Sequence, residues 1–233
     1  MTRILLIRHA HSVANANGIL AGKSPGVVLT DLGQKQSLEL AERLAGSKIN
    51  KVRISPLERC HLTLAPLLDS MPAKSRPQIE VDDNLSEVDY GKWTGKKLTA
   101  LYREKLWSVV QSRPSAMYFP NGEGLAEVQV RAMRSLHSAA NEGGLQVLVS
   151  HGDVIKSLVA AVLGTHLDNF QKIVIDPASI TVLDYDGKDF RVLALNSTSK
   201  PIADLAQASA KKRSAKKRSA KALLGGGSGT SSK

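Results

Sequence analysis

The feature that most restricts the fold of this chain is a regular alternation of strand-like and helix-like segments over residues 1–195. Short runs rich in Val, Ile and Leu recur between longer amphipathic segments, which is typical of strands connected by helices. The strand-like runs are residues 3–7, 51–54, 78–81, 145–149, 179–185 and 190–195. The helix-like runs are residues 32–45, 57–68, 96–110, 124–140 and 154–163.

This alternation predicts an α/β fold, a three-layer sandwich in which helices flank a central, mostly parallel sheet. Thr30-Asp31 can cap the helix expected over residues 32–45. The last two strand-like runs are joined through Asp186-Gly187, a typical hairpin turn. We therefore expect one folded domain over residues 1–198 with an antiparallel hairpin at an edge of its sheet.

Residues 199–233 have a different composition. Residues 211–220 repeat KKRSA twice, and residues 225–233 read GGGSGTSSK. From residue 201 onward the chain carries eight Lys or Arg and one Asp, a net +7 of its total +11. Such a segment buries too little apolar surface to offset its ordering entropy, so we predict a disordered basic tail. The tail is either solvated charge or a weak, salt-sensitive contact for nucleic acid or another polyanion.

The remaining composition indicates a globular, cytoplasmic protein. Hydrophobic residues make up 42% and charged residues 23% of the chain. No apolar stretch approaches the length of a membrane span, so no membrane partner is expected. The N-terminal apolar run ends on Arg8-His9 rather than at a small-residue cleavage site, which argues against a signal peptide. The single cysteine, Cys60, is compatible with a reducing compartment, and none of these features specifies an oligomeric state.

Reactive or charged side chains follow four of the predicted strands. They lie in Arg8-His9, in residues 55–59 (SPLER), at Glu87 and in residues 150–153 (SHGD). Ligands of open α/β sheets bind beyond the carboxyl ends of the strands. If the four strands are neighbours, these side chains therefore converge at one edge of the sheet.

Two interpretations of that convergence compete. His9 and His11 could form a His-x-His metal site, but two nearby guanidinium groups would oppose a divalent cation. The same set suits a phosphoryl group, because an arginine fork matches phosphate oxygens and an imidazole can hold the phosphoryl group covalently. A glutamate can protonate the leaving oxygen. The residue types therefore favour phosphoryl transfer without a metal or another cofactor.

Four blocks of sequence carry these residues. The first is Arg8-His9-Ala10-x-Ser12-x-x-Asn15, and the second is residues 55–59, SPLER. The third is residues 85–95, LSEVDYGKWTG, and the fourth is residues 150–152, SHG. Together, in this order and at this approximate spacing, they resemble the histidine phosphatase superfamily, in its phosphoglycerate mutase-like branch.

The resemblance implies a catalytic set of five residues. His9 would be the nucleophile, and Glu87 would protonate the leaving alcohol and then activate water. Arg8, Arg59 and His151 would surround the phosphoryl group. The implied substrate or phosphate contacts are Ser12, Asn15, Ala21, Gly22 and Gly152.

The sequence also departs from the family pattern. Ala10 replaces the usual glycine after the nucleophile, and Thr94 replaces an acidic residue. Residues 120–124, PNGEG, resemble a family Pro-x-Gly-Glu-Ser segment with Gly124 in place of serine. These departures leave the catalytic set complete and concern substrate choice. We interpret His11 as a pocket neighbour, and the two tryptophans, Trp93 and Trp107, as core or pocket wall.

Three functional hypotheses follow. The first is a phosphomonoester hydrolase that acts on a small phosphorylated metabolite through a phosphohistidine intermediate. The second is a cofactor-dependent phosphomutase that uses the same site. Residues 95–122 are the only obvious lid in this short chain, which favours the hydrolase, since a mutase must exclude water. The third is a binding protein that depends on the basic tail, which would have no reason to keep all five catalytic residues.

Overall fold

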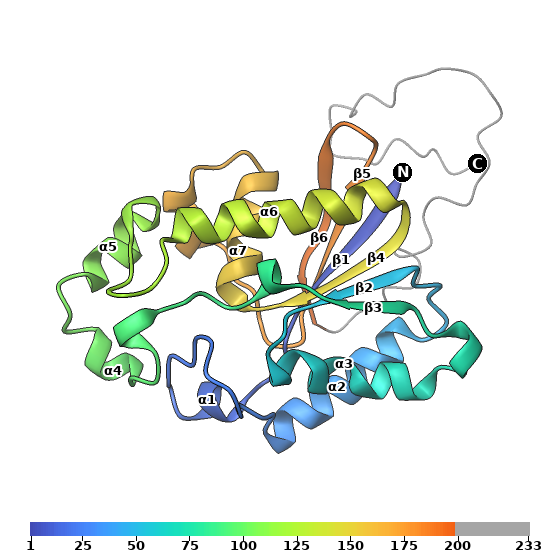
Figure 1. The fold of residues 1–233 in the computed structure, drawn as a ribbon, viewed down its shortest axis with the longest axis horizontal. Helices are drawn as coiled ribbons and strands as arrows, with labels where there is room; N and C mark the ends of the chain where they lie inside the picture. Colours follow the sequence, from blue (N-terminus) through green and yellow to red (C-terminus); the bar gives the residue numbers. More distant parts are fainter. Residues whose placement is uncertain (199–233) are drawn as a thin grey trace.

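A computed structural model describes residues 1–198 of the chain. Within these residues six strands form one sheet in the order β3-β2-β4-β1-β5-β6 (Figure 1). Strands β1 to β4 run parallel, and β5 and β6 pair antiparallel at one side of the sheet. Their bounds are β1 Thr2–Arg8, β2 Lys51–Ile54, β3 Gln78–Val81, β4 Gly144–Ser150, β5 Ile180–Tyr185 and β6 Phe190–Ser197. The predicted mostly parallel sheet and its edge hairpin are confirmed.

Helices cover both faces of this sheet and complete the predicted three layers. Helices α6 and α7 lie on one face, and α2 and α3 lie on the other (Figure 1). The α-helices are α1 Val13–Ala16, α2 Asp31–Leu44, α3 Glu58–Ser70, α4 Leu98–Leu101, α5 Trp107–Ser112, α6 Leu125–Glu142 and α7 Gly152–Val162. Short 3-10 helices span Ala73–Ser75, Asp83–Leu85, Gly91–Trp93, Pro114–Ala116 and Leu167–Lys172. The basic tail predicted over residues 199–233 lies outside the described residues.

Strand β1 shows why its sequence is a continuous apolar run. Successive side chains of a strand point to opposite faces of the sheet. Ile4 and Leu6 therefore join the core beneath α6 and α7, while Leu5 and Ile7 join the core beneath α2 and α3. A strand that is buried on both faces needs apolar residues at every position. β1 consequently brings Arg8 and the next residue to the carboxyl edge of the sheet.

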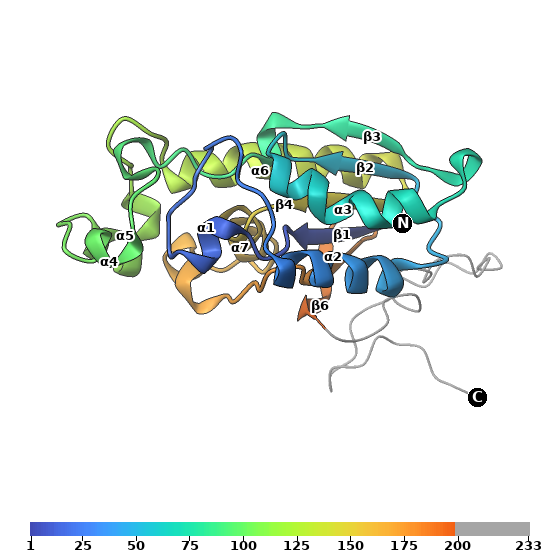
Figure 2. The same ribbon diagram turned by 90° about the horizontal axis from the view of Figure 1, so that it is seen from below.

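The single helix predicted over residues 96–110 is wrong. The segment instead forms two short helices, α4 and α5, that project beyond the end of the sheet (Figure 2). At about 100° per residue, a continuous helix would turn Trp107 roughly half a turn away from Leu98. The break over residues 102–106 lets both side chains face the same cavity.

Candidate active site

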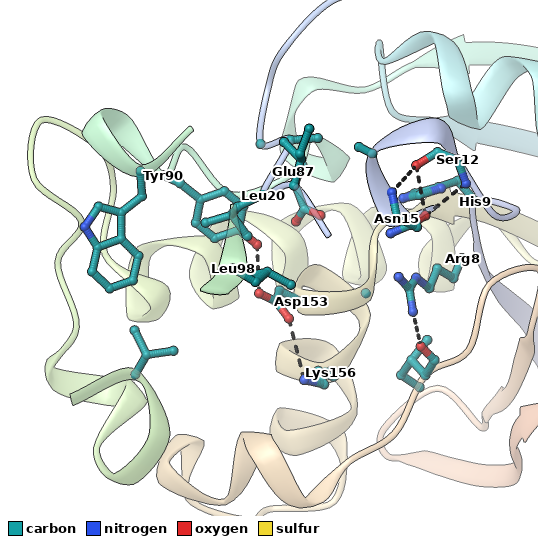
Figure 3. A pocket seen from close by; sticks show the side chains of 18 of the residues that line it. Arg8, His9, Ser12, Asn15, Leu20, Glu87, Tyr90, Leu98, Asp153 and Lys156 are labelled. Carbon is teal, nitrogen blue, oxygen red and sulfur yellow. Dashed lines mark hydrogen bonds and ion pairs between the residues drawn. The ribbon is translucent and has the colours of Figure 1, made fainter. Parts of the chain in front are cut away.

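The four segments predicted to converge meet at the carboxyl edge of the parallel strands. They meet because β3, β2, β4 and β1 are neighbours in the sheet. A cavity of about 370 Å³ opens there, and Arg8, His9, Arg59 and Glu87 line it. Figure 3 shows Arg8 and His9 on one side of this cavity, with Glu87 facing them from another segment.

His9 is held with one ring nitrogen free. The side chain is only 4% exposed, and its Nδ1 lies 2.8 Å from the carbonyl oxygen of Ala10. A carbonyl accepts only, so Nδ1 carries the proton and Nε2 keeps its lone pair. Burial, with the charges of Arg59 and Arg8, holds the pKa of His9 well below its ordinary value. The imidazole is therefore neutral and nucleophilic near pH 7.

The turn after His9 is fixed by helix α3. The backbone N–H of Ala10 donates to Thr63 Oγ1 at 2.8 Å, and that hydroxyl donates to the carbonyl of Arg59 at 2.7 Å. The same α3 residue, Arg59, points into the cavity. The turn after β1 that carries His9 and the helix that carries Arg59 are thus connected through one buried hydroxyl.

Arg8 lines the cavity with a partly engaged guanidinium. Its Nη1 donates to the carbonyl of Ile175 at 2.5 Å, whereas its Nε is buried and has no hydrogen-bond partner among the described residues. A Cβ added at Gly152 would lie 3.3 Å from that Nε. Gly152 therefore lets the guanidinium lie against the first turn of α7. A cation beside a helix N-terminus, with a donor to spare, is suited to an anion.

Arg59 is the second cation of the site, and it is buried. It is 2% exposed, and its Nη2 donates to the carbonyl of Gly22 at 2.8 Å and lies 3.2 Å from Nδ1 of His151. His151 is fully buried, and its Nε2 lies 2.8 Å from Ser55 Oγ. Its ring centroid is 5.2 Å from that of His9. Among the described residues that line the cavity, however, His151 is not included. His151 is thus fully buried beside Arg59, with its Nδ1 also 3.8 Å from Glu87 Oε2.

Ser12 and Asn15 orient each other at the start of α1. The hydroxyl and backbone N–H of Ser12 both donate to Asn15 Oδ1, at 2.9 and 3.0 Å (Figure 3). This leaves the amide nitrogen of Asn15 to face a ligand. Both residues line the cavity, as do Ala21 and Gly22. Gly22 has φ of +52°, and an added Cβ would lie 3.0 Å from Thr94 Oγ1, so this position requires glycine.

Glu87 has the electrostatic environment of a general acid. Its side chain is 12% exposed, and its Oε1 accepts the backbone N–H of Val88 at 3.0 Å. Burial and the neighbouring carboxylate of Asp153 raise its pKa to about 7, while Arg59 opposes that rise. A carboxyl with a pKa near the working pH can both donate and accept a proton.

A polar wall that the sequence analysis did not assign lies opposite the phosphoryl side. Asp153 Oδ2 accepts the hydroxyl of Tyr90 at 2.8 Å, and its Oδ1 lies 3.6 Å from Lys156 Nζ (Figure 3). Lys156 also donates to Gln171 Oε1 at 3.2 Å. The available signal was the spacing of three between Asp153 and Lys156, which places both side chains on one face of α7.

The secondary interpretations can be compared with the structure directly. Trp93 and Trp107 both line the cavity, as pocket wall. The ring Nδ1 of His11 lies 2.9 Å from Thr30 Oγ1, the N-cap of α2, so His11 joins the nucleophile turn to that helix. Cys60 is fully buried, and burial raises the pKa of its thiol to about 12.

The residues that face the cavity differ from those of a metal centre. Within residues 1–198, no group of three or more His, Cys, Asp or Glu side chains is arranged to hold a metal ion. The same residues contain no helix long and apolar enough to cross a membrane. The cavity instead combines two arginines, a neutral histidine and a glutamate whose pKa is raised, which suits a phosphate ester.

Comparison with known proteins also indicates an enzyme that acts on phosphate esters. The chain is 31% identical over 206 residues to phosphoserine phosphatase 1 of Hydrogenobacter thermophilus, covering 85% of this chain and 93% of that protein. It is 29% identical to a glucosyl-3-phosphoglycerate phosphatase of Mycolicibacterium vanbaalenii, over 72% of this chain and 77% of that protein. The solved structure of Bacillus stearothermophilus YhfR superposes with a TM-score of 0.79 at 25% identity, covering 85% of this chain and 98% of that one. The model of the histidine phosphatase superfamily (branch 1) matches residues 4–198, and the chain therefore belongs to that family.

Proposed function

We propose that this protein is a phosphomonoester hydrolase that transfers the phosphoryl group of a small phosphorylated metabolite first to His9 and then to water. The observation that carries the proposal is a neutral His9 whose Nε2 has no hydrogen-bond partner among the described residues, placed with the guanidiniums of Arg8 and Arg59 and with Glu87 across the cavity. The names of the phosphatase relatives support the same reaction class.

In the first step, His9 Nε2 attacks phosphorus and the bond from phosphorus to the ester oxygen breaks. Arg8 and Arg59 meet the negative charge of the transferring group with donors that are already in place. Glu87 in its protonated form gives its proton to the departing alkoxide, which leaves as the alcohol. Its pKa of about 7 keeps part of the population protonated near neutral pH.

In the second step, the ionised Glu87 takes a proton from water, and the resulting hydroxide attacks the phosphorus of phosphohistidine. The bond from His9 Nε2 to phosphorus breaks, so inorganic phosphate and the neutral imidazole are formed. Glu87 ends protonated, ready for the next cycle. His151 holds the Arg59 guanidinium in place through its Nδ1, which lies 3.2 Å from Arg59 Nη2.

A phosphomutase that uses the same residues is the second candidate. It is supported by relatives named as probable phosphoglycerate mutases, among them a protein of Enterobacter that is 28% identical over 190 residues. A mutase must keep water away from phosphohistidine, and within residues 1–198 the only obvious lid is the short segment that forms α4 and α5. We expect the balance to favour hydrolysis. Free phosphate measured against isomerised product, over a panel of phosphosugars and phosphoglycerates, separates the two reactions.

The decisive experiment labels the nucleophile. Protein mixed with a ³²P-labelled substrate and quenched in alkali should retain the label, whereas acid quench should release it, as expected for phosphohistidine. His9→Ala should abolish labelling and turnover. His137→Ala is the matched control, because that exposed ring on α6 contacts Phe190 and does not line the cavity, and it should still be labelled. Full activity of His9→Ala would refute the proposal.

Three further parts of the proposal concern the whole chain. The folded domain spans residues 1–198, which is supported by the family match over residues 4–198. We place the protein in the cytoplasm, on the basis of its single, buried cysteine.

The basic segment from residue 201 onward makes weak, salt-sensitive contact with nucleic acid or another polyanion. Deletion of residues 201–233 should remove that binding and leave phosphatase activity unchanged.

A further inference from the structure

The loop that presents Glu87 is clamped by residues distant from it in sequence. Residues 82–89 connect β3 to the wall of the cavity, and Glu87 reaches the cavity from this loop. Arg131 of α6 and Glu123, just before α6, contact the loop on both sides of Glu87. Neither residue lines the cavity of the active site within the described part of the chain.

All three nitrogens of the Arg131 guanidinium donate hydrogen bonds to the loop or to Glu123. Its Nη1 donates to the carbonyls of Asn84 and Ser86, each at 2.7 Å, and its Nη2 donates to the carbonyl of Glu87 at 3.2 Å. Its Nε and Nη2 also donate to the two carboxylate oxygens of Glu123, at 3.0 and 2.8 Å. The rigid fork of arginine can make this set of bonds, whereas a lysine ammonium cannot.

Glu123 completes the clamp beyond Glu87. Its Oε1 accepts the backbone N–H of Asp89 at 2.7 Å, and its own N–H donates to the carbonyl of Asp89 at 3.0 Å. Its carboxylate also lies 3.9 Å from Lys23 Nζ, on the loop that carries Ala21 and Gly22. The Arg131–Glu123 pair therefore joins the acid loop to the loop that borders the phosphoryl group.

The PNGEG segment is shaped to deliver Glu123 to this place. A Cβ added at Gly122 would overlap the carbonyl oxygen of Asp89, and one added at Gly91 would overlap that of Pro120. The two backbones approach each other closely only because both positions are glycine. The side chains of Arg131 and Glu123 are then 15% and 17% exposed, so their charges meet in a partly dry environment.

We propose that the Arg131–Glu123 pair positions the general acid: it fixes the backbone of residues 84–89 so that the carboxyl of Glu87 meets the leaving oxygen. The inference rests on the proposed function, in which Glu87 protonates that oxygen. A hydrogen bond to the backbone on each side of a catalytic side chain restricts where the side chain can reach. General acid catalysis depends on such placement within hydrogen-bond reach of the proton acceptor.

This role has a kinetic signature that a purely structural role lacks. An aryl phosphate such as p-nitrophenyl phosphate releases a stable phenolate, so its reaction with His9 needs little help from an acid. An alkyl phosphate releases a strongly basic alkoxide and depends on proton donation. Loosening the clamp should therefore slow phosphorylation of His9 by alkyl phosphates and spare phosphorylation by aryl phosphates.

The experiment measures phosphohistidine formation by rapid quench, over a series of phosphate esters with different leaving-group pKa values. The variants are Arg131→Lys, which keeps the charge but loses the fork, and Glu123→Gln, which keeps the size. Glu87→Gln provides the reference for complete loss of the acid. Arg134→Gln, an exposed arginine one turn along the same helix, is the matched control. Thermal melts establish that each variant is folded.

We expect the two clamp variants to slow alkyl transfer about 10-fold to 100-fold, part of the roughly 10²–10⁴-fold that general acids contribute. Their dependence on leaving-group pKa should move toward that of Glu87→Gln, while Arg134→Gln follows the wild type. Equal slowing for alkyl and aryl esters, or no slowing, would overturn the positioning role. A wild type that forms no phosphohistidine would instead overturn the proposed function itself.

Discussion

Replacing Glu87 with glutamine should make the protein more stable at alkaline pH while removing its acid catalyst. Burial and the charge of Asp153 raise the pKa of Glu87 from 4.5 to about 7. The folded protein therefore holds this proton more tightly than the unfolded chain does. Glutamine cannot ionise, yet its side-chain oxygen can still accept the N–H of Val88, which Glu87 accepts at 3.0 Å.

The sign of the effect follows from linkage. Because the folded-state pKa is raised, stability is fully present below the unfolded pKa and is lost as pH rises through the folded pKa. Each tenfold change in proton affinity is worth about 1.4 kcal/mol. The rise from 4.5 to about 7 thus corresponds to roughly 3 kcal/mol of stability lost by the wild type above pH 7.

Urea unfolding in phosphate-free buffers measures this directly. The free energy of unfolding of Glu87→Gln should be larger than that of the wild type, by about 1 kcal/mol at pH 5 and by about 3 kcal/mol at pH 8.5. Glu39→Gln, at an exposed site of α2, should show no such increase with pH. The same difference between Glu87→Gln and the wild type at both pH values would refute the electrostatic reasoning.

Three further outcomes follow from the geometry. Asp153→Asn removes a charge that raises the pKa of Glu87, so the alkaline limb of the pH–rate profile for alkyl phosphates should move to lower pH. Gly152→Ala places a methyl group 3.3 Å from Arg8 Nε. It should therefore weaken binding of the phosphate analogue vanadate several-fold, measured by titration, while the melting temperature changes little. Exhaustive dialysis against EDTA should leave turnover unchanged in a phosphate-release assay, since the guanidiniums of Arg8 and Arg59 supply the positive charge that a metal ion would otherwise provide.

The phosphoryl half of the site could be predicted from the sequence because its residues directly follow strands. Arg8-His9 continues β1, and residues 55–59 continue β2 into α3. Strand ends are recognisable in a sequence, and the parallel order of the sheet brings them together. Every phosphate ester presents the same phosphoryl group to these residues. The residue types that bind it can therefore be recognised without knowing the rest of the substrate. The block of His151 was recognisable in the same way, and its contact with Arg59 depends on side-chain packing.

The leaving-group half could not be predicted in this way. Trp107 and Leu98 face the same cavity only because residues 102–106 break a segment whose local pattern resembles one helix. Lys156 enters the wall through contacts with Asp153 and with Gln171, which lies in a separate 3-10 helix. The Asp153–Lys156 pair has a recognisable helical spacing of three, but the contact with Gln171 joins two separate elements, and no local spacing indicates it.

Arg131 illustrates the same limit for positioning residues. In sequence it is one of two arginines in α6. Glu123 lies eight residues earlier and outside the helix, so no helical spacing links the pair. Only the close approach of the backbones at Gly91 and Gly122 brings Glu123 to it. A carboxyl catalyst needs a proton of suitable affinity and a fixed place. Burial beside Asp153 supplies the first to Glu87, and a clamp outside the cavity supplies the second, so substitutions that alter protonation and placement should be separable at this site.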